Sequence, residues 1–292
     1  MIMRIHAILA AAFAFAAPIS AQADNFKLAI TDVEGLERLQ TEWGPFKAAL
    51  EQASGHTFEF FPVNNRTAAA EALRAKRVDF VITGPAEYVV IQKMADAKSL
   101  IGLSRPDYFC AIVVKADSPF VKPADLKGEK VALDDVGSTS GHLCPSQLFA
   151  DYGLDPKSEI GVTHTTRAVA HEALKRGDVA AIGVNYTSWT NGVRDKDTST
   201  PPGAFRVIAR SGDLPSDLLV VGAHVDPAVS ASIQAKMVEN KASVIDGIIS
   251  AGGENAKYQG MDLVAIDDAA YAPVRSMYAT IGYPQYSEFI GE

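Results

Sequence analysis

Three consecutive hydroxyl side chains flanked by glycines make the loop over 137–141 the most chemically distinctive stretch of this chain. The loop reads Gly-Ser-Thr-Ser-Gly, follows a short apolar run over 131–133 and precedes a helical pattern that extends to Tyr152. A loop that opens a helix in this way directs backbone N–H groups and hydroxyl donors at one point, which predicts a site for an oxygen-rich or anionic small ligand. The nucleophile elbow of hydrolases has a similar outline, but its G-x-S-x-G pattern needs serine where this chain has Thr139. The pattern therefore indicates binding rather than catalysis.

The two cysteines, Cys110 and Cys144, are the other residues with distinctive chemistry. In an oxidising compartment they can pair as one disulfide; alternatively they are two separate thiols, at least one of which has a function. Cys144 would lie one turn into the helix that follows the hydroxyl loop, where the start of a helix favours a thiolate. Both interpretations remain open at the level of the sequence.

The N-terminal residues predict export. Arg4 gives a positive start, the apolar run over 8–17 is too short to span a bilayer, and Ala21-Gln22-Ala23 has the small-x-small pattern of a cleavage site. We therefore expect a signal peptide over 1–23. No cysteine near the cleavage point could carry a lipid, and no later segment is apolar for long enough to cross a membrane. These features predict a soluble protein, most simply in a bacterial periplasm.

The charge of the chain argues against nucleic acid as a partner. Residues 1–23 contain Arg4 and no acidic residue, so their removal changes the formal net charge from -8 to about -9. The acidic mature chain is long enough to bury a large core in one or two domains.

Strand and helix patterns alternate along the mature chain, which predicts an α/β architecture with largely parallel sheets. Expected strands cover 26–30, 57–62, 79–82, 99–104, 108–115, 131–133, 161–164, 179–184, 205–210 and 218–221. Expected helices cover 36–53, 67–76, 140–152 and 167–176, one begins at Pro85, and the tail after 221 is mostly helical. Since the tail has too few strands for a third sheet, we expect it to rejoin the first unit. The prediction is two lobes with two crossovers, 24–107 plus 212–292 and 108–211.

Three motifs occur in an order that resembles the phosphonate-binding (PhnD-like) periplasmic solute-binding proteins. They are RVDFVITGPAEY over 77–88, ADLKG over 124–128 and GSTSG over 137–141. The resemblance covers essentially the whole mature chain. It implies a type II-like periplasmic binding protein fold, in which two α/β lobes joined by hinge strands close on a ligand in the cleft. It also implies a monomer that is not an enzyme, has no cofactor and serves an ABC importer or a sensor kinase.

The family's ligand residues carry over where this chain matches. The resemblance places Ser138, Thr139 and Ser140 in the loop that grips the ligand's oxygens, and Tyr88 at the cleft edge of the first lobe. Helix capping is the alternative role for the hydroxyls, and packing is the alternative for Tyr88.

Two positions depart from the family pattern. Arg167 stands where phosphonate binders usually have histidine, and Asn185 stands where an acid would meet the ammonium of an aminophosphonate. A fixed guanidinium suits an oxyanion or several hydroxyls, although a solvated residue at a helix start is the alternative. The absence of the acid argues against aminoalkylphosphonates.

Cys110 is a third departure, because small residues usually line the corresponding hinge strand. An arsenite-sensing variant of the family, the AioX type, is similar to this chain in having a cysteine on that stretch. Neutral arsenite is thiophilic and offers hydroxyls, so a soft sulfur with hydroxyl and amide partners would suit it. The resulting hypothesis is an arsenite sensor in which Cys110, with or without Cys144, binds the arsenic and the closed protein signals to a membrane histidine kinase.

Three other functions were weighed against this hypothesis. A binding protein for phosphite, phosphate, phosphonate or arsenate that feeds an ABC permease explains Arg167 and the hydroxyls but gives Cys110 no role. A metal site is disfavoured because none of His56, His142, His164, His171 and His224 forms a compact ligand pair with a carboxylate partner. An enzyme is disfavoured because no complete triad or paired-acid pattern is present.

Overall fold

The computed structural model describes residues 23–31, 33, 35–63, 65 and 68–286. The predicted signal peptide over 1–23 therefore lies, apart from Ala23, outside the described residues. Within the described ranges, no helix is long and apolar enough to cross a membrane.

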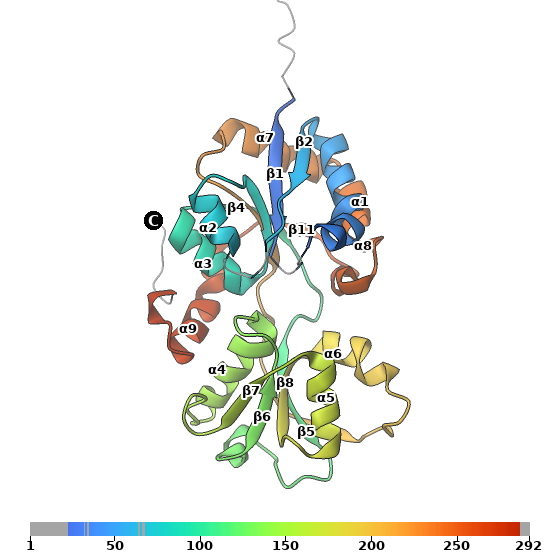
Figure 1. The fold of residues 1–292 in the computed structure, drawn as a ribbon, viewed down its shortest axis with the longest axis vertical. Coiled ribbons are helices and arrows are strands. Elements are labelled where there is room, and N and C mark those ends of the chain that lie inside the picture. Colours follow the sequence, from blue (N-terminus) through green and yellow to red (C-terminus); the bar gives the residue numbers. More distant parts are fainter. Residues whose placement is uncertain (1–22, 32, 34, 64, 66–67, 287–292) are drawn as a thin grey trace, which may run out of the picture.

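Two separate sheets form the framework (Figure 1). The first has the order β11-β4-β10-β3-β1-β2, and the second has the order β7-β6-β8-β5-β9. The strands of the first sheet are β1 (Asn25–Ile30), β2 (Thr57–Phe60), β3 (Phe80–Thr83), β4 (Lys98–Leu103), β10 (Asp217–Val221) and β11 (Leu263–Val264). Those of the second are β5 (Cys110–Lys115), β6 (Lys130–Leu133), β7 (Gly161–His164), β8 (Ala181–Asn185) and β9 (Phe205–Arg210). We call the parts of the chain around these sheets the first and second lobes.

Helices cover both sheets (Figure 1). The first lobe carries α1 (Leu36–Ser54), α2 (Ala68–Arg74), α3 (Pro85–Ala95), α7 (Pro227–Glu239) and α8 (Lys241–Ile249). The second lobe carries α4 (Cys144–Asp151), α5 (Arg167–Arg176) and α6 (Tyr186–Gly192). The last helix, α9 (Ala272–Thr280), packs on α3 of the first lobe and on α4 of the second.

The expectation of largely parallel sheets was wrong, because both sheets are mixed. Strands β1, β2 and β3 pair in parallel, as do β6, β7 and β8. The strands next to the crossovers are antiparallel: β10 pairs with β3 and β4, and β5 pairs with β8 and β9. A strand that returns from the other lobe enters its sheet from the opposite end, so it runs against its neighbours.

Helix α1 shows why the sequence forms this framework. Its buried residues, Leu39, Trp43, Phe46 and Leu50, recur every three or four positions and so lie on one face. That face packs against α7 and α8 and joins the apolar side chains of the first sheet. Burial of each such side chain contributes about 1.5–3 kcal/mol. Glu42 lies at the edge of this buried face, next to Trp43, and its side chain is 17% exposed.

Candidate functional site

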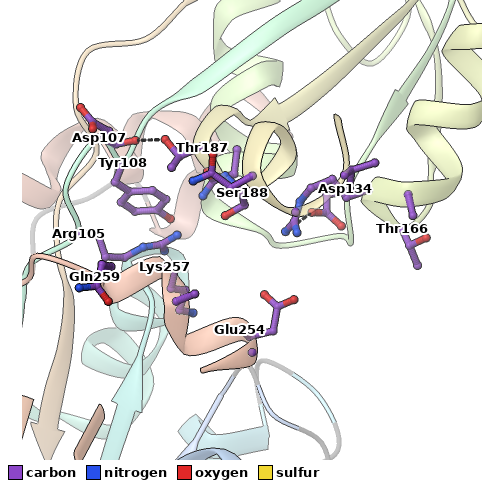
Figure 2. A pocket seen from close by; sticks show the side chains of 18 of the residues that line it. Arg105, Asp107, Tyr108, Asp134, Thr166, Thr187, Ser188, Glu254, Lys257 and Gln259 are labelled. Carbon is purple, nitrogen blue, oxygen red and sulfur yellow. Dashed lines mark hydrogen bonds and ion pairs between the residues drawn. The ribbon is translucent and has the colours of Figure 1, made fainter. Parts of the chain in front are cut away.

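Two adjoining cavities, of about 860 and 390 Å³, lie between the lobes. The larger one opens beside the segment that joins β4 to β5, where Arg105 and Tyr108 lie, and is bounded by Ser188 and Glu254 from opposite lobes (Figure 2). The smaller one is lined by all three residues of the hydroxyl triplet, Ser138 to Ser140. Cavities lined by both lobes are suited to a ligand that is enclosed when the lobes close.

The hydroxyl loop is held in shape by close backbone packing against Asp134. The Asp134 amide donates to the Gly141 carbonyl at 2.9 Å, and a Cβ on Gly141 would lie 2.3 Å from the Asp134 Cβ. Gly137 has φ +90°, a conformation that favours glycine. Both glycines of the motif are therefore required by the geometry. The chain then forms a π-helical turn over Thr139–Leu143 that leads directly into α4.

Each hydroxyl of the triplet accepts a hydrogen bond from the protein. Ser138 Oγ accepts from the Gly141 amide at 3.3 Å, so the capping role considered from the sequence is present. Thr139 Oγ1 accepts from the Ala86 amide at 3.0 Å, and Ser140 Oγ accepts from Asn185 Nδ2 at 3.2 Å. A hydroxyl that accepts still has its own proton to donate. Three oriented donors therefore remain in this part of the cavity wall.

The two cysteines form a disulfide. Their Cα atoms lie 6.1 Å apart, and both residues are buried in the hydrophobic core rather than in the walls of the two cavities. The coordination of arsenic predicted for Cys110, with or without Cys144, therefore has no thiol available in this state. Cys110 lies opposite Asn185 in the β5–β8 pairing. The disulfide and the Asn185–Ser140 hydrogen bond thus tie neighbouring positions of the sheet to the C-terminal part of the hydroxyl loop and to the first residue of α4.

Arg167, which the sequence predicts as a ligand residue, lines both cavities. It is the first residue of α5, whose N-cap Thr166 accepts from the Val169 amide. Its Nη2 lies 3.6 Å from Asp134 Oδ2, and its Nε is buried without a partner among the described residues. The guanidinium therefore lies beside the hydroxyl loop with a donor still unused.

Asn185 has a structural role at the edge of the site. Its side-chain oxygen caps α6 by accepting from the Ser188 amide at 3.0 Å, while its Nδ2 group holds Ser140. It lines only the larger cavity, and it is itself 4% exposed. Both ends of its amide are thus used within the protein.

Tyr88 lies outside both cavities, so the packing alternative describes it. It is 1% exposed, its ring packs against that of Tyr271, and its hydroxyl donates to Asp268 Oδ1 at 2.8 Å. Burial and the neighbouring Asp268 carboxylate raise the pKa of Tyr88 to about 12. In this environment the phenol of Tyr88 is neutral, and its hydrogen bond to Asp268 anchors the C-terminal segment.

The first lobe contributes cavity residues that the sequence did not reveal. Asp217, 1% exposed, accepts from Tyr258 Oη at 2.6 Å and from Arg105 Nη1 at 3.3 Å. The Arg105 guanidinium in turn lies 3.6 Å from the centre of the Tyr108 ring (Figure 2). The contacts among these four residues hold the charged side chains of Asp217 and Arg105 in place at the back of the cleft. These residues come from separate elements, so no local motif marks them.

A histidine pair supports the hydroxyl loop from outside. His142 Nδ1 accepts from the Gly137 amide at 3.0 Å, and His164 Nδ1 lies 2.7 Å from the Asp134 carbonyl oxygen. The two rings meet edge to face with centres 4.6 Å apart. Burial, and next the proximity of His164, lower the pKa of His142 to about 4. His142 is therefore neutral at neutral pH, as its acceptor role requires.

One group of possible metal ligands exists among the described residues, namely His171, Glu172 and Asp197. Lys175 already occupies it: its Nζ lies 2.6 Å from Asp197 and 3.1 Å from Glu172. His171 also uses its other ring nitrogen to accept from Trp189 Nε1 at 3.2 Å. The arrangement is that of an ion-pair network around a lysine.

Comparison with known proteins places this geometry in context. Residues 28–258 match the family described as ABC transporter, phosphonate, periplasmic substrate-binding protein. The chain is 27% identical over 154 residues to the tetrathionate sensor histidine kinase TtrS of Salmonella typhimurium, covering 50% of this chain and 26% of that protein. It is 28% identical over 148 residues to the phosphate-import protein PhnD of Mycolicibacterium smegmatis, covering 47% of this chain and 46% of that protein. The chain thus aligns with less than half the length of either relative.

The fold is shared with PhnD1 from Prochlorococcus marinus, whose structure was solved in complex with methylphosphonate. The TM-score is 0.67 at 15% identity, covering 89% of this chain and 98% of PhnD1. The predicted periplasmic binding protein fold is thereby confirmed, with the correction that both sheets are mixed.

Proposed function

Since the chain belongs to the family of periplasmic substrate-binding proteins of phosphonate ABC transporters, we propose that it binds a small oxyacid of the phosphonate, phosphite or phosphate type in the periplasm. The ligand lies between the hydroxyl loop and Arg167, and the lobes close on it. The closed form is then recognised by an ABC permease. Lobe closure is a shift between open and closed populations, so the permease need only distinguish the two shapes.

The observation that carries this proposal is the position of Arg167 beside the loop. Its Nε has no partner among the described residues although the atom is buried, and the three residues of the hydroxyl triplet line the same cavity as Arg167. Oxyanion oxygens accept hydrogen bonds from such donors, and a bond from a charged donor contributes about 1.5–3 kcal/mol. The disulfide has a supporting role here because it fixes the end of the loop.

Arsenite sensing, the more specific hypothesis from the sequence, requires a change in the redox state of the cysteines. Thiolate ligation of arsenic needs the Cys110–Cys144 disulfide to be reduced first, by exchange with another thiol. Arsenite binding to the unreduced protein would have to use oxygen and nitrogen donors alone. We therefore place the transporter-type function ahead of it.

A membrane sensor kinase is the second candidate for the partner that recognises the closed form. The similarity of half of this chain to a sensor histidine kinase favours it. In that case the closed form would contact a membrane kinase rather than a permease. The ligand site proposed above is the same in both cases.

Calorimetric titration of the unreduced mature protein with methylphosphonate, phosphite, phosphate and arsenite tests the proposal. We expect binding of at least one phosphorus oxyacid, and binding about 10 to 100 times weaker in Arg167→Met. Arg176→Met, a change on the exposed face of the same helix, serves as the matched control. Arsenite binding that appears only after reduction would favour the sensor hypothesis instead.

A further inference from the structure

The first lobe lines the smaller cavity with carboxylates as well as with Arg38, Arg105 and Lys257, and the binding of a simple anion does not explain the carboxylates. Glu42 and Glu87 both line the smaller cavity, opposite the hydroxyl loop and Arg167. Glu87 is 3% exposed and lies in the first turn of α3. Its neighbour Ala86 donates to Thr139, so this turn lies directly against the loop. A fully deprotonated anion held by the loop would face these carboxylates.

Unpartnered polar atoms occur among the residues of both lobes that line this cavity. Among the described residues, five buried side-chain nitrogen and oxygen atoms have no hydrogen-bond partner, and three of them belong to residues that line the smaller cavity. They are Glu42 Oε2, Trp43 Nε1 and Arg167 Nε. Buried polar atoms without partners are rare in proteins, so such a cluster points to a ligand that supplies the missing bonds.

The acceptor in this cluster belongs to a side chain that is paired with a guanidinium. Arg38 donates to Glu42 Oε1 from Nε at 2.9 Å, and its Nη2 lies 2.8 Å from the same oxygen. This leaves Oε2, which is buried, as the carboxylate oxygen without a partner among the described residues. Trp43 Nε1 can only donate. The first lobe therefore offers one acceptor and one donor from adjacent residues of α1, whereas the hydroxyl loop and Arg167 of the second lobe offer donors beside Asp134 and Asp135.

We propose that Glu42, supported by Glu87, selects ligands that keep an acidic O–H and rejects oxyanions that have none. A phosphonate, phosphite or phosphate that retains one proton can donate to Glu42 while its other oxygens accept from the hydroxyl loop, Arg167 and Trp43. A sulfonate or sulfate has no proton to donate, so its oxygens would meet the carboxylate directly. This inference rests on the proposed function and specifies the ligand class of the same site.

Methylphosphonate and methanesulfonate form the test pair because they have similar shapes and differ in the O–H. Affinities for both are measured by calorimetry in mildly acidic buffer, where methylphosphonate keeps one proton. We expect the wild type to prefer methylphosphonate by about 100-fold or more, since a site built to accept a ligand proton strongly rejects the analogue that lacks it. In Glu42→Gln the new amide can donate to a sulfonate oxygen, so the preference should fall at least about tenfold.

Two further variants make the result specific. Glu87→Gln tests the second carboxylate and should also lower the preference. Glu59→Gln, an exposed change on β2, removes the same charge outside the cleft and should leave the preference unchanged. Equal binding of the two compounds by the wild type, or a preference that survives in both cleft variants, would overturn this inference while oxyanion binding stands. Failure to bind either compound or any other phosphorus oxyacid would overturn the proposed function itself.

Discussion

Thr139 Oγ1 of the second lobe accepts a hydrogen bond from the Ala86 amide of the first lobe at 3.0 Å. The central hydroxyl of the loop thus connects the cavity to the first turn of α3. The contact is reinforced by α9, where Thr280 Oγ1 donates to Gln147 at 2.6 Å across the lobes. One side of the lobe junction is therefore closed by packing, and the ligand cavities lie on the other.

Removal of the Thr139 hydroxyl should favour separation of the lobes. Thr139→Val keeps the shape of the side chain but leaves the buried Ala86 amide without its acceptor, at a cost of about 1–3 kcal/mol to the joined arrangement. We expect a larger radius of gyration by small-angle X-ray scattering. Thr163→Val, an exposed change on β7, is the control and should scatter like the wild type. An unchanged radius in Thr139→Val would show that this bond does not hold the lobes together.

The Cys110–Cys144 disulfide should stabilise the fold, and the unreduced protein should contain no reactive thiol. A disulfide that closes a loop between positions 34 residues apart stabilises the fold by about 3–4 kcal/mol in the chain-entropy model. The double variant Cys110→Ala with Cys144→Ala should therefore unfold at a lower denaturant concentration. It should also bind a phosphorus oxyacid more weakly, because the covalent link between β5 and the start of α4, directly after the hydroxyl loop, is lost. Thiol titration under denaturing conditions, with and without reductant, checks the pairing. Two free thiols without reductant would refute it.

The fold and one wall of the site could be predicted from the sequence, and the other wall could not. The alternation of apolar and amphipathic runs located the strands and helices, and the hydroxyl loop and Arg167 stand out locally. Glu42 and Trp43, in contrast, lie in a helix whose pattern predicts only an amphipathic face. Whether its polar edge faces solvent or the second lobe depends on how the lobes pack. The cysteine pairing is likewise a contact between a strand and a distant helix, which spacing alone does not determine.

Both the oxygen and the nitrogen of the Asn185 side-chain amide should contribute to stability or binding. Asn185→Asp keeps an oxygen that can cap α6 but loses the donor to Ser140, whereas Asn185→Ala loses both. A lost N-cap costs about 0.5–2 kcal/mol, so the alanine variant should be the less stable of the two in chemical denaturation. Both variants should weaken oxyacid binding because Ser140 is released. If the aspartate variant proved as unstable as the alanine variant, the capping role would be refuted.

Acidification should destabilise the protein through His142, which is 8% exposed. Burial lowers the pKa of His142 to about 4 in the folded state, below its ordinary value of 6.5. Between these values the unfolded state binds the proton more readily, so this contribution is present above pH 6.5 and is lost as the pH falls toward 4. Loss of this contribution lowers the free energy of unfolding by about 3 kcal/mol. Denaturation of His142→Asn should depend less steeply on pH in this window, and identical slopes would contradict the assignment.

The most direct test of the central claim is calorimetry of the unreduced protein with phosphorus oxyacids, for the wild type and for Arg167→Met. We predict that the wild type binds at least one of them without any reductant and that the variant binds it about 10 to 100 times more weakly, with unchanged thermal stability. Undiminished binding by Arg167→Met, or binding that requires reduction of the Cys110–Cys144 disulfide, would contradict the account.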